Sequence, residues 1–407
     1  MDSKSLIGII DISSENIKCV IFESNNEGSR EVVSSSLIKS QGINNCKIIN
    51  PSKASKAIRQ CVTEAEKKGK VSLNKINVVL EQPEFLCTKL SKSRKIGGSK
   101  IQQEDIEFLL KEAKKQIILN DKTQSIIHIF NHNYIVDGKK FLEEPIDIYA
   151  DFLSHEMTFI TLPINNLKNI NQVFFECDLE VERLISLTFS LGSKLLNSNQ
   201  LENGSILIEF EFERTSIGIF KKLALVDSLT FPIGANHFSK DISKVCSLSL
   251  EESENIRNTI NFSPTNNAQI FDESDYLKEV FFKTSKYRKI SKNLILKVIE
   301  ARLNEMLEII QKHLKESGVD LNSQSDFCIT GKYSNVLNLE KYLSVFFKLE
   351  VKKVDTENNS NLFDGFTACV GAYNIIKDGW ETEAIACSDK TKNEKAGFFA
   401  RLFGNYS

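Results

Sequence analysis

Two acidic residues, Asp11 and Glu209, lie in strand-like apolar segments and come shortly before polar turns. The segments 9–23 and 207–221 share this order of strand, acidic residue, polar turn and second strand, about half a chain apart. Two similar α/β halves that face each other would form a cleft, with both acidic turns along it. Carboxylates in such a cleft could hold a metal-bound polyphosphate, since oxygen ligands suit Mg²⁺. This repeat is our first hypothesis for a functional site.

The two turns differ in how well they suit a phosphate. Phosphate loops need small residues, because backbone N–H groups must approach the phosphate oxygens closely. Ser13 and Ser14 are small, whereas residues 209–215 read Glu-Phe-Glu-Phe-Glu-Arg-Thr and include no glycine. Like charge near a triphosphate is unfavourable, although Mg²⁺ and Arg214 could offset part of it. The second turn is therefore poorly suited to a polyphosphate.

Glu209, Glu211 and Glu213 stand at spacing two, so they share one face if the segment is a strand. Three interpretations stay open. The carboxylates could form a solvated strand face backed by apolar residues, an altered Mg-nucleotide site, or a free-standing metal cluster.

Other catalytic patterns are absent from the sequence. His128 and His132 are four residues apart, but they fall in a predicted strand and the loop after it, with no third ligand nearby. They are interpreted as structural residues. No nucleophile motif such as Gly-x-Ser-x-Gly occurs. We assign no catalytic residue and no metal site.

The elements around these residues follow an α/β pattern. The first 80 residues predict a hairpin (6–12 and 17–22), an amphipathic helix (53–68) and a strand (76–80). Residues 81–166 differ, with a helix at 104–116, strands at 125–130 and 156–162, and a turn at Asp137-Gly138, and so predict a small α+β insertion. The α/β pattern then resumes, with a strand at 171–176, a helix at 181–196 and a long helix at 294–317.

Composition narrows the class of protein. Lys and Arg total 52 and Asp and Glu total 54, a net charge of −2, which argues against a nucleic-acid partner. Hydrophobic residues make up 41% and charged residues 26%, as in globular domains. The nine cysteines form no CxxC pair and indicate buried thiols in a reducing compartment. With no bilayer-length apolar run and no signal-peptide pattern, we expect a cytoplasmic protein.

A series of short motifs occurs in a fixed order. They are the Asp11-Ile12-Ser13-Ser14 hairpin with Lys18, the strand pair at 126–146, Phe-Pro-Ile-Gly-Ala-Asn-His-Phe-Ser-Lys-Asp-Ile at 231–242, Ser-Glu-Asn-Ile-Arg at 253–257, the segment 299–305 and Thr330-Gly331. Together they resemble the FtsA family of bacterial cell-division proteins, within the actin and heat-shock-chaperone ATPase superfamily. The match runs over nearly the whole chain.

The resemblance implies a fold. We expect an α/β protein with an actin-like two-lobed fold, an inserted small α+β subdomain and a C-terminal amphipathic helix. The expected domains are a first lobe (1–80 plus 167–197), the insertion (81–166), a second lobe (198–245 plus 316–380), a helical or mixed subdomain of that lobe (246–315), a flexible linker (381–395) and a membrane-binding helix (396–407).

The resemblance also implies ATP with Mg²⁺ as cofactor and assigns roles by position, if a site survives. Asp11 and Glu209 would hold Mg-bound water; Ser13, Ser14 and Lys18 would contact phosphates; Glu254 and Arg257 would face the ribose and base; Gly331 would approach the adenosine; and Gly234 is retained. Each also has a structural interpretation. Lys18 could be a surface strand residue, and Glu254 with Arg257 a surface pair.

The sequence departs from the family in its phosphate loops. Ser13 stands where the family has a glycine. The family's second loop has three glycines and two threonines after an Asp, and here Arg214 replaces the first threonine. Lys332 replaces the second glycine of the adenosine loop. Because of these departures we expect nucleotide binding to be weakened or lost and hydrolysis to be slow or absent, with at most a weak ATPase activity.

The C-terminus combines a polar linker with an amphipathic end. On a helix, Phe398, Phe399, Leu402 and Phe403 would fall within an arc of about 140°, with Arg401 off that arc. Such a face suits an interfacial helix on anionic lipid, although it is too short to span a bilayer. The alternatives are a frayed terminus and a helix docked on its own core.

The resemblance implies an adaptor that tethers the tubulin-like FtsZ polymer to the cytoplasmic face of the inner membrane at the division site. It would polymerise head to tail into filaments, like actin, and recruit later division proteins. Residues 246–315 would bind the acidic C-terminal peptide of FtsZ, and Lys292, Lys297 and Arg302 would be the cations that contact it. The alternative is that these three side chains form a solvated helix face. The alternatives are a pilus-assembly adaptor of the same fold and, less favoured, a phosphotransferase such as a sugar kinase.

Overall fold

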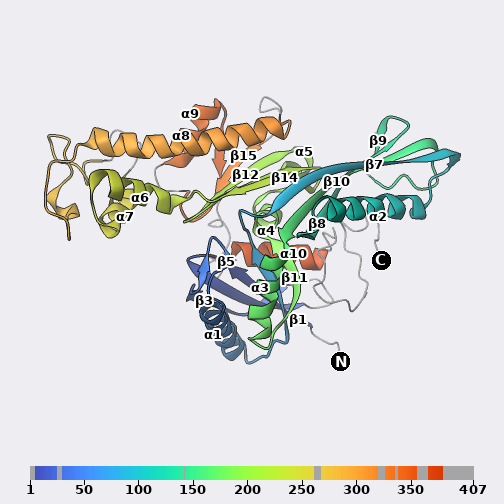
Figure 1. Cartoon of the computed structure of the whole chain (residues 1–407), viewed down its shortest axis with the longest axis horizontal. Helices are drawn as coiled ribbons and strands as arrows, with labels where there is room; N and C mark the ends of the chain where they lie inside the picture. The colour runs from blue at the N-terminus through green and yellow to red at the C-terminus, as the bar shows by residue number, and fades with distance from the viewer. Residues whose placement is uncertain are drawn as a thin grey trace. The chain divides into compact units, whose positions relative to one another are not determined.

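The computed structural model describes residues 5–24, 30–141, 143–260, 267–319, 326–334, 338–354 and 365–378 (Figure 1). The chain divides into two compact units. The first unit comprises Met1–Gly204, Gly218–Leu229 and Thr356–Ser407, and the second comprises Ser205–Ile217 and Thr230–Asp355. The predicted linker at 381–395 and terminal helix at 396–407, with Phe398, Phe399, Arg401, Leu402 and Phe403, lie outside the described residues.

A five-stranded sheet forms the centre of the first unit, in the order β11-β6-β1-β2-β3. Its strands are β1 (Ser5–Ile12), β2 (Asn16–Ser24), β3 (Arg30–Lys39), β6 (Lys75–Leu80) and β11 (Glu180–Ser186). β1 and β2 form the predicted hairpin, and β6 runs parallel to both β1 and β11. β6 is buried from Ile76 to Leu80, as expected for a strand covered on both faces. A short two-stranded sheet, β4 (Ile43–Asn44) and β5 (Lys47–Ile48), lies nearby in the chain.

The helix predicted at 53–68 is confirmed as α1 (Pro51–Gly69). Asn50 caps its start by accepting a hydrogen bond from the Lys53 N–H, and Pro51 occupies the first turn, where no N–H is needed. Ala57, Ile58 and other buried residues at helical spacing face β2 and β3. Other helices of this unit are α3 (Ile164–Phe175), α4 (Leu187–Leu195), α5 (Ser198–Asn203) and α10 (Thr367–Asp378).

Two predicted elements of this unit are wrong. The segment predicted as a strand at 171–176 belongs to helix α3, because Ile170, Val173 and Phe174 bury one helical face. The helix predicted at 181–196 is instead strand β11 followed by α4, with the break at Ser186. The Ser186 side chain caps α4, so the helix begins there and not at the start of the apolar run.

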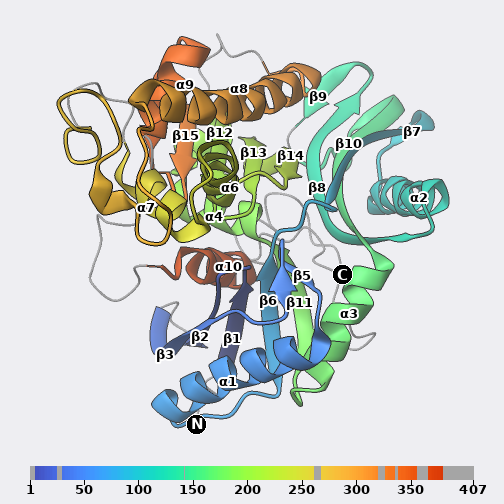
Figure 2. The same cartoon turned by 60° about the vertical axis from the view of Figure 1, so that its left-hand side comes forward.

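The insertion is a four-stranded sheet in the order β7-β10-β8-β9, with one helix along it (Figure 2). The elements are β7 (Leu86–Lys100), α2 (Gln103–Asn120), β8 (Gln124–Val136), β9 (Lys139–Phe141) and β10 (Tyr149–Pro163). Ile106 and Leu109 of α2 pack against Tyr134 and Leu153 of the sheet. The predicted α+β content is confirmed, and the predicted turn at Asp137-Gly138 joins β8 to β9.

The second sheet has the order β14-β13-β12-β15-β16. Its strands are β12 (Ser205–Phe210), β13 (Thr215–Lys221), β14 (Ala224–Phe231), β15 (Asp326–Thr330) and β16 (Val351–Lys353), and the boundary between the two units falls within β13 and within β14. β12 pairs in parallel with β15 and is buried along its whole length. The second unit also contains α6 (Ala235–Cys246), α7 (Leu250–Thr259), the short helix η1 (Glu279–Phe281), α8 (Lys292–Glu316) and α9 (Leu339–Phe347).

Two sequence expectations can be compared with the described residues. The eight cysteines within them are free thiols, and all but Cys87 are buried, as predicted. Among the same residues, none of the helices combines the length and apolar character needed to cross a bilayer.

Candidate functional site

The first predicted hairpin places Asp11 near the end of β1, directly opposite Lys18 of β2. The Lys18 ammonium lies 3.5 Å from Asp11 Oδ2. Asp11 is 3% exposed, and its Oδ1 accepts no hydrogen bond within the described part of the chain. A buried carboxylate oxygen without a donor is unfavourable, and a metal-bound water would supply one. This half of the predicted site therefore fits a hydrated Mg²⁺.

The turn between β1 and β2 is held by its own serines. The Ser13 hydroxyl donates to the Asn16 carbonyl at 2.9 Å and accepts from the Asn16 N–H at 3.2 Å. The Ser14 hydroxyl accepts from the Cys46 N–H at 3.3 Å. Both predicted phosphate ligands thus also stabilise the loop that carries them.

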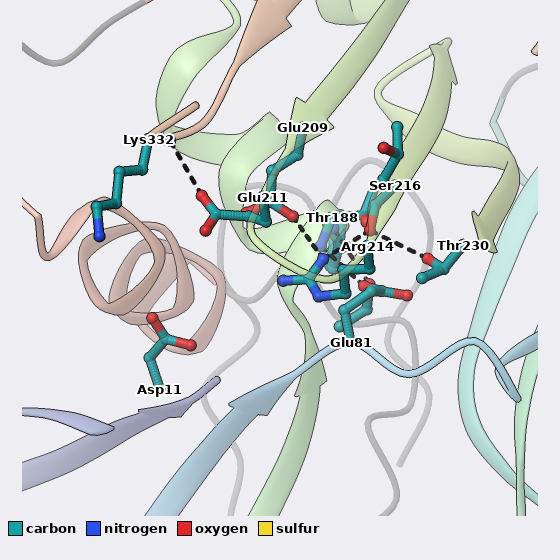
Figure 3. A network of polar contacts seen from close by, with 12 residues as sticks. Asp11, Glu81, Thr188, Glu209, Glu211, Arg214, Ser216, Thr230 and Lys332 are labelled. Atoms are coloured by element: carbon teal, nitrogen blue, oxygen red, sulfur yellow. Dashed lines mark hydrogen bonds and ion pairs between the residues drawn. The ribbon is translucent and has the colours of Figure 1, made fainter. Parts of the chain in front are cut away.

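In the second unit, Glu209 forms a buried ion pair with Arg214 (Figure 3). The guanidinium donates to Glu209 Oε2 at 2.7 Å and to the Ser216 hydroxyl at 2.7 Å, and Ser216 in turn contacts Thr230 at 3.2 Å. Glu209 is 6% exposed and Arg214 is 4% exposed. The interpretation of Glu209 as part of a solvated strand face is therefore wrong, because its side chain is buried and paired with Arg214.

Glu211 and Phe212 reach from the hairpin to the loop that follows β15. Glu211 Oε1 accepts a hydrogen bond from the Lys332 N–H at 3.1 Å (Figure 3). The Phe212 and Tyr333 rings lie 5.8 Å apart, and the Arg257 guanidinium is 5.2 Å from the Tyr333 ring centre. The structure thus brings Arg257, a predicted base-side residue, to the same loop as Gly331.

Arg257 and Glu254, its partner in the alternative interpretation, are not equally exposed. Glu254 is half-buried, whereas Arg257 is buried. Arg257 is 3% exposed and donates to the Ala235 carbonyl at 3.2 Å. The alternative interpretation, a surface ion pair of Glu254 with Arg257, is therefore wrong for the arginine.

Two retained glycines are required by close backbone packing. A Cβ at Gly234 would lie 2.3 Å from the Glu211 carbonyl oxygen. Gly331 has φ +103° and a Cβ there would lie 2.5 Å from the Phe210 carbonyl oxygen, so this position accepts no other residue without strain. Both glycines thus hold neighbouring segments against the hairpin.

The open hypothesis of a free-standing metal cluster at Glu209, Glu211 and Glu213 is not supported by the geometry. Within the described ranges, no group of three or more His, Cys, Asp or Glu side chains is placed to hold a metal ion.

A buried polar network that the sequence did not reveal lies at the start of α4. Glu81, 1% exposed, follows β6, and its Oε2 accepts from the Ser186 hydroxyl at 2.8 Å and from the Thr188 N–H at 3.0 Å. The Ser186 N–H donates to His128 Nε2 at 2.9 Å. The network ties strand β8 of the insertion to β6 and β11. The structural interpretation of His128 is confirmed by its complete burial; the side chain of His132 is outside the described part.

His128 predicts a pH dependence of stability. Burial, with a smaller effect of the positive charge of Arg183, lowers the pKa of His128 from 6.5 to about 3. The folded state therefore disfavours protonation, and stability is complete above pH 6.5 and decreases as the pH falls towards 3. We expect a loss of up to about 1.4 kcal/mol per pH unit in this window, measured by urea unfolding between pH 7 and 5.

The control variant is His128→Gln, which keeps an acceptor for the Ser186 N–H but cannot titrate. The decrease in unfolding free energy between pH 7 and 5 should be smaller in this variant. Equal decreases in both proteins would mean that His128 does not cause the pH dependence.

The three predicted FtsZ-binding cations on α8 differ in their surroundings. Arg302 is held by Asp241, through contacts of 2.6 and 3.0 Å, and also contacts Glu305. Lys292 lies 3.3 Å from Asp275, and Lys297 is exposed. Lys297 is therefore the member of the set most open to an acidic partner.

Solved structures define the class of protein. The PilM-PilN type IV pilus biogenesis complex has a TM-score of 0.59 at 11% identity, over 86% of this chain and 88% of that chain. MreB 5 of Spiroplasma citri bound to AMPPNP has a TM-score of 0.51 at 13% identity, over 92% of this chain and 96% of that chain. At these identities the likeness concerns the fold, and the predicted actin-like α/β fold with an inserted subdomain is confirmed.

Within that class the sequence is FtsA-like. The family model "SHS2 domain inserted in FTSA" matches residues 85–161. The Cell division protein FtsA of Buchnera aphidicola is 24% identical over 380 residues, 90% of this chain and 88% of that protein. FtsA of Agrobacterium fabrum is 22% identical over 347 residues, 82% of this chain and 77% of that protein. The resemblance to FtsA is confirmed.

Proposed function

We propose that this protein is a cell-division adaptor that tethers FtsZ polymers to the cytoplasmic face of the inner membrane at the division site. The observation that carries the proposal is an SHS2 insertion of the FtsA type within an actin-like fold, in a chain similar to FtsA over most of its length. An actin-like fold also suits the proposed self-association into filaments and the recruitment of later division proteins.

The FtsZ-binding end of the adaptor is proposed at residues 246–315 of the second unit. The ligand would be the acidic C-terminal peptide of FtsZ. Lys297 is exposed and Lys292 has a surface ion pair that a competing carboxylate could replace, since such pairs contribute about 0–1 kcal/mol. Arg302 is held by Asp241, so we propose that it positions α8 against α6.

The membrane-binding end is proposed at the C-terminal residues 396–407. This part of the proposal rests on the sequence, where Phe398, Phe399, Leu402 and Phe403 would share one face. A single short helix binds anionic lipid weakly, and several copies on one filament would supply the avidity needed for stable attachment.

Removal of the tail is expected to abolish FtsZ recruitment to lipid. FtsZ should pellet with anionic liposomes when the intact protein is present, and stay in solution when the protein is truncated after Lys395. Phe403→Ser should lower the pelleted fraction several-fold because it interrupts the apolar face. The control Asn405→Ser should leave it unchanged. Co-sedimentation measures all four.

The alternatives predict different outcomes of the same experiment. If the intact protein does not bind the liposomes, the membrane proposal is wrong. If it binds but leaves FtsZ in solution, a pilus-type adaptor becomes the better function, and the PilM-PilN complex favours that alternative by its fold.

A further inference from the structure

Mg-ATP is the cofactor that the fold family implies, and the two predicted hairpins fit it unequally. In the first unit, Asp11 has a buried oxygen that finds no donor among the described residues, and a hydrated cation could supply one. In the second unit, Glu209, Glu211 and Phe212 of the hairpin 209–215 already contact other groups of the same unit. Three observations within this unit show the misfit.

The first observation concerns charge. A buried carboxylate needs a positive partner, and Glu209 has one in Arg214 of the same hairpin, at 2.7 Å. Because the Arg214 side chain is itself 4% exposed and its guanidinium also donates to Ser216, the group is fixed in place. The negative charge of Glu209 is therefore already neutralised, and little of it is left to attract a cation.

The second observation concerns space. A phosphate loop needs small residues so that the backbone can approach the ligand. Glu211, Phe212 and Glu213 carry side chains where the resemblance places glycines. The Glu211 carboxylate bonds the Lys332 N–H, and the Phe212 ring lies 5.8 Å from that of Tyr333. Glu211 and Phe212 therefore reach from the hairpin to the loop after β15, and Figure 3 shows the contact of Glu211 with Lys332.

The third observation concerns hydrogen-bond donors. The free N–H groups at a helix N-terminus are a ready anion site. In α6 the Ala235 N–H donates to the Glu211 carbonyl at 2.9 Å and the Asn236 N–H donates to the Phe212 carbonyl at 2.7 Å. These donors therefore bind the hairpin backbone.

We propose that the second unit carries its own substitute for the polar groups of a nucleotide. Arg214 is the internal cation for Glu209, Glu211 is the internal anion for the loop at Lys332, and Phe212 fills the space between them. The hairpin then keeps its shape without Mg-nucleotide and excludes the triphosphate. This proposal is independent of FtsZ and lipid binding, so it can fail while the adaptor function stands.

Thermal unfolding of the full-length protein with and without 5 mM Mg-ATP tests the proposal. A ligand at 100 times its Kd stabilises a protein by about 2.7 kcal/mol, which raises the Tm by several degrees. We expect a Tm change below about 1 °C, and no Mg-dependent binding of a fluorescent ATP analogue. A Tm rise of several degrees, with saturable Mg-dependent binding of the analogue, would overturn the proposal.

A variant that restores small residues tests whether these side chains exclude the nucleotide. Glu211→Gly, Phe212→Gly, Glu213→Gly and Arg214→Thr are combined in one protein. It should bind the analogue at least about tenfold more tightly than the parent, in a Mg-dependent way. The matched control is Lys139→Gly with Lys140→Gly, in the exposed β8–β9 hairpin. It should bind the analogue no more tightly than the parent protein does.

The variant remains informative if its stability is low. Should the combined variant fail to fold, Phe212→Gly alone removes the largest side chain and allows the same binding measurement. A folded variant that binds the analogue no better than the parent would show that the hairpin side chains are not the obstacle, and would overturn the proposal.

Discussion

Replacement of Arg214 by Met is expected to lower the free energy of unfolding by about 3–5 kcal/mol, the cost of breaking a buried ion pair from one side. Met has a similar volume, so the main change is electrostatic. Glu209, 6% exposed in the interior strand β12, would lose the positive charge that offsets its burial. Urea unfolding at pH 7 measures the loss.

The double variant Glu209→Gln with Arg214→Met is the control for this prediction. Replacement of both charges by neutral side chains is often close to neutral, so the double variant should be more stable than the single one. Equal stability of the single and double variants at pH 7 would contradict the prediction.

Replacement of Glu252 by Ala is expected to lower the free energy of unfolding by about 3 kcal/mol or more, because it removes a buried carboxylate that accepts several hydrogen bonds. Glu252 is fully buried in α7. It accepts from the Ser249 N–H at 2.7 Å, the Thr284 N–H at 2.7 Å, and the Ser285 N–H and hydroxyl at 2.9 and 2.6 Å. These bonds anchor the loop between η1 and α8. The Glu252→Ala variant should therefore be cleaved faster by a lysine-specific protease at Lys283 and Lys286.

The neighbouring variant Glu251→Ala provides a matched control. Glu251 is exposed and pairs with Lys283 at 2.9 Å, an exposed ion pair worth about 0–1 kcal/mol. Similar losses of unfolding free energy for both variants would show that the loop does not depend on the buried carboxylate.

The stability difference between the protein and Glu252→Ala should also depend on pH. Burial alone would raise the pKa of Glu252, but the hydrogen bonds from Ser285, Thr284 and Ser249 outweigh it and hold the pKa well below 4.5. A lowered folded-state pKa means that the contribution is present above pH 4.5 and is lost as the pH falls further. The difference in urea midpoints should therefore shrink below pH 4.5.

Local patterns in the sequence were sufficient to predict the first hairpin and the helix that follows it. The β1–β2 pair and helix α1 were predicted because strand alternation, turn residues and helical spacing are properties of neighbouring residues. The segment around Ser186 was not, because an apolar run there spans two elements. The change from β11 to α4 depends on a cap whose hydroxyl binds Glu81, a residue from a distant part of the chain.

The sequence by itself determined the fold class, the place of the insertion and the likeness to FtsA. Motif order and periodicity are properties of the order of residues and do not require the tertiary contacts to be known. The tertiary structure decided the character of the second hairpin. Spacing showed that Glu209, Glu211 and Glu213 could share a strand face, but whether a face is solvated depends on what packs against it, which spacing does not contain. β12 ends at Phe210 and Glu209 is 6% exposed, and this burial makes Arg214 its required partner.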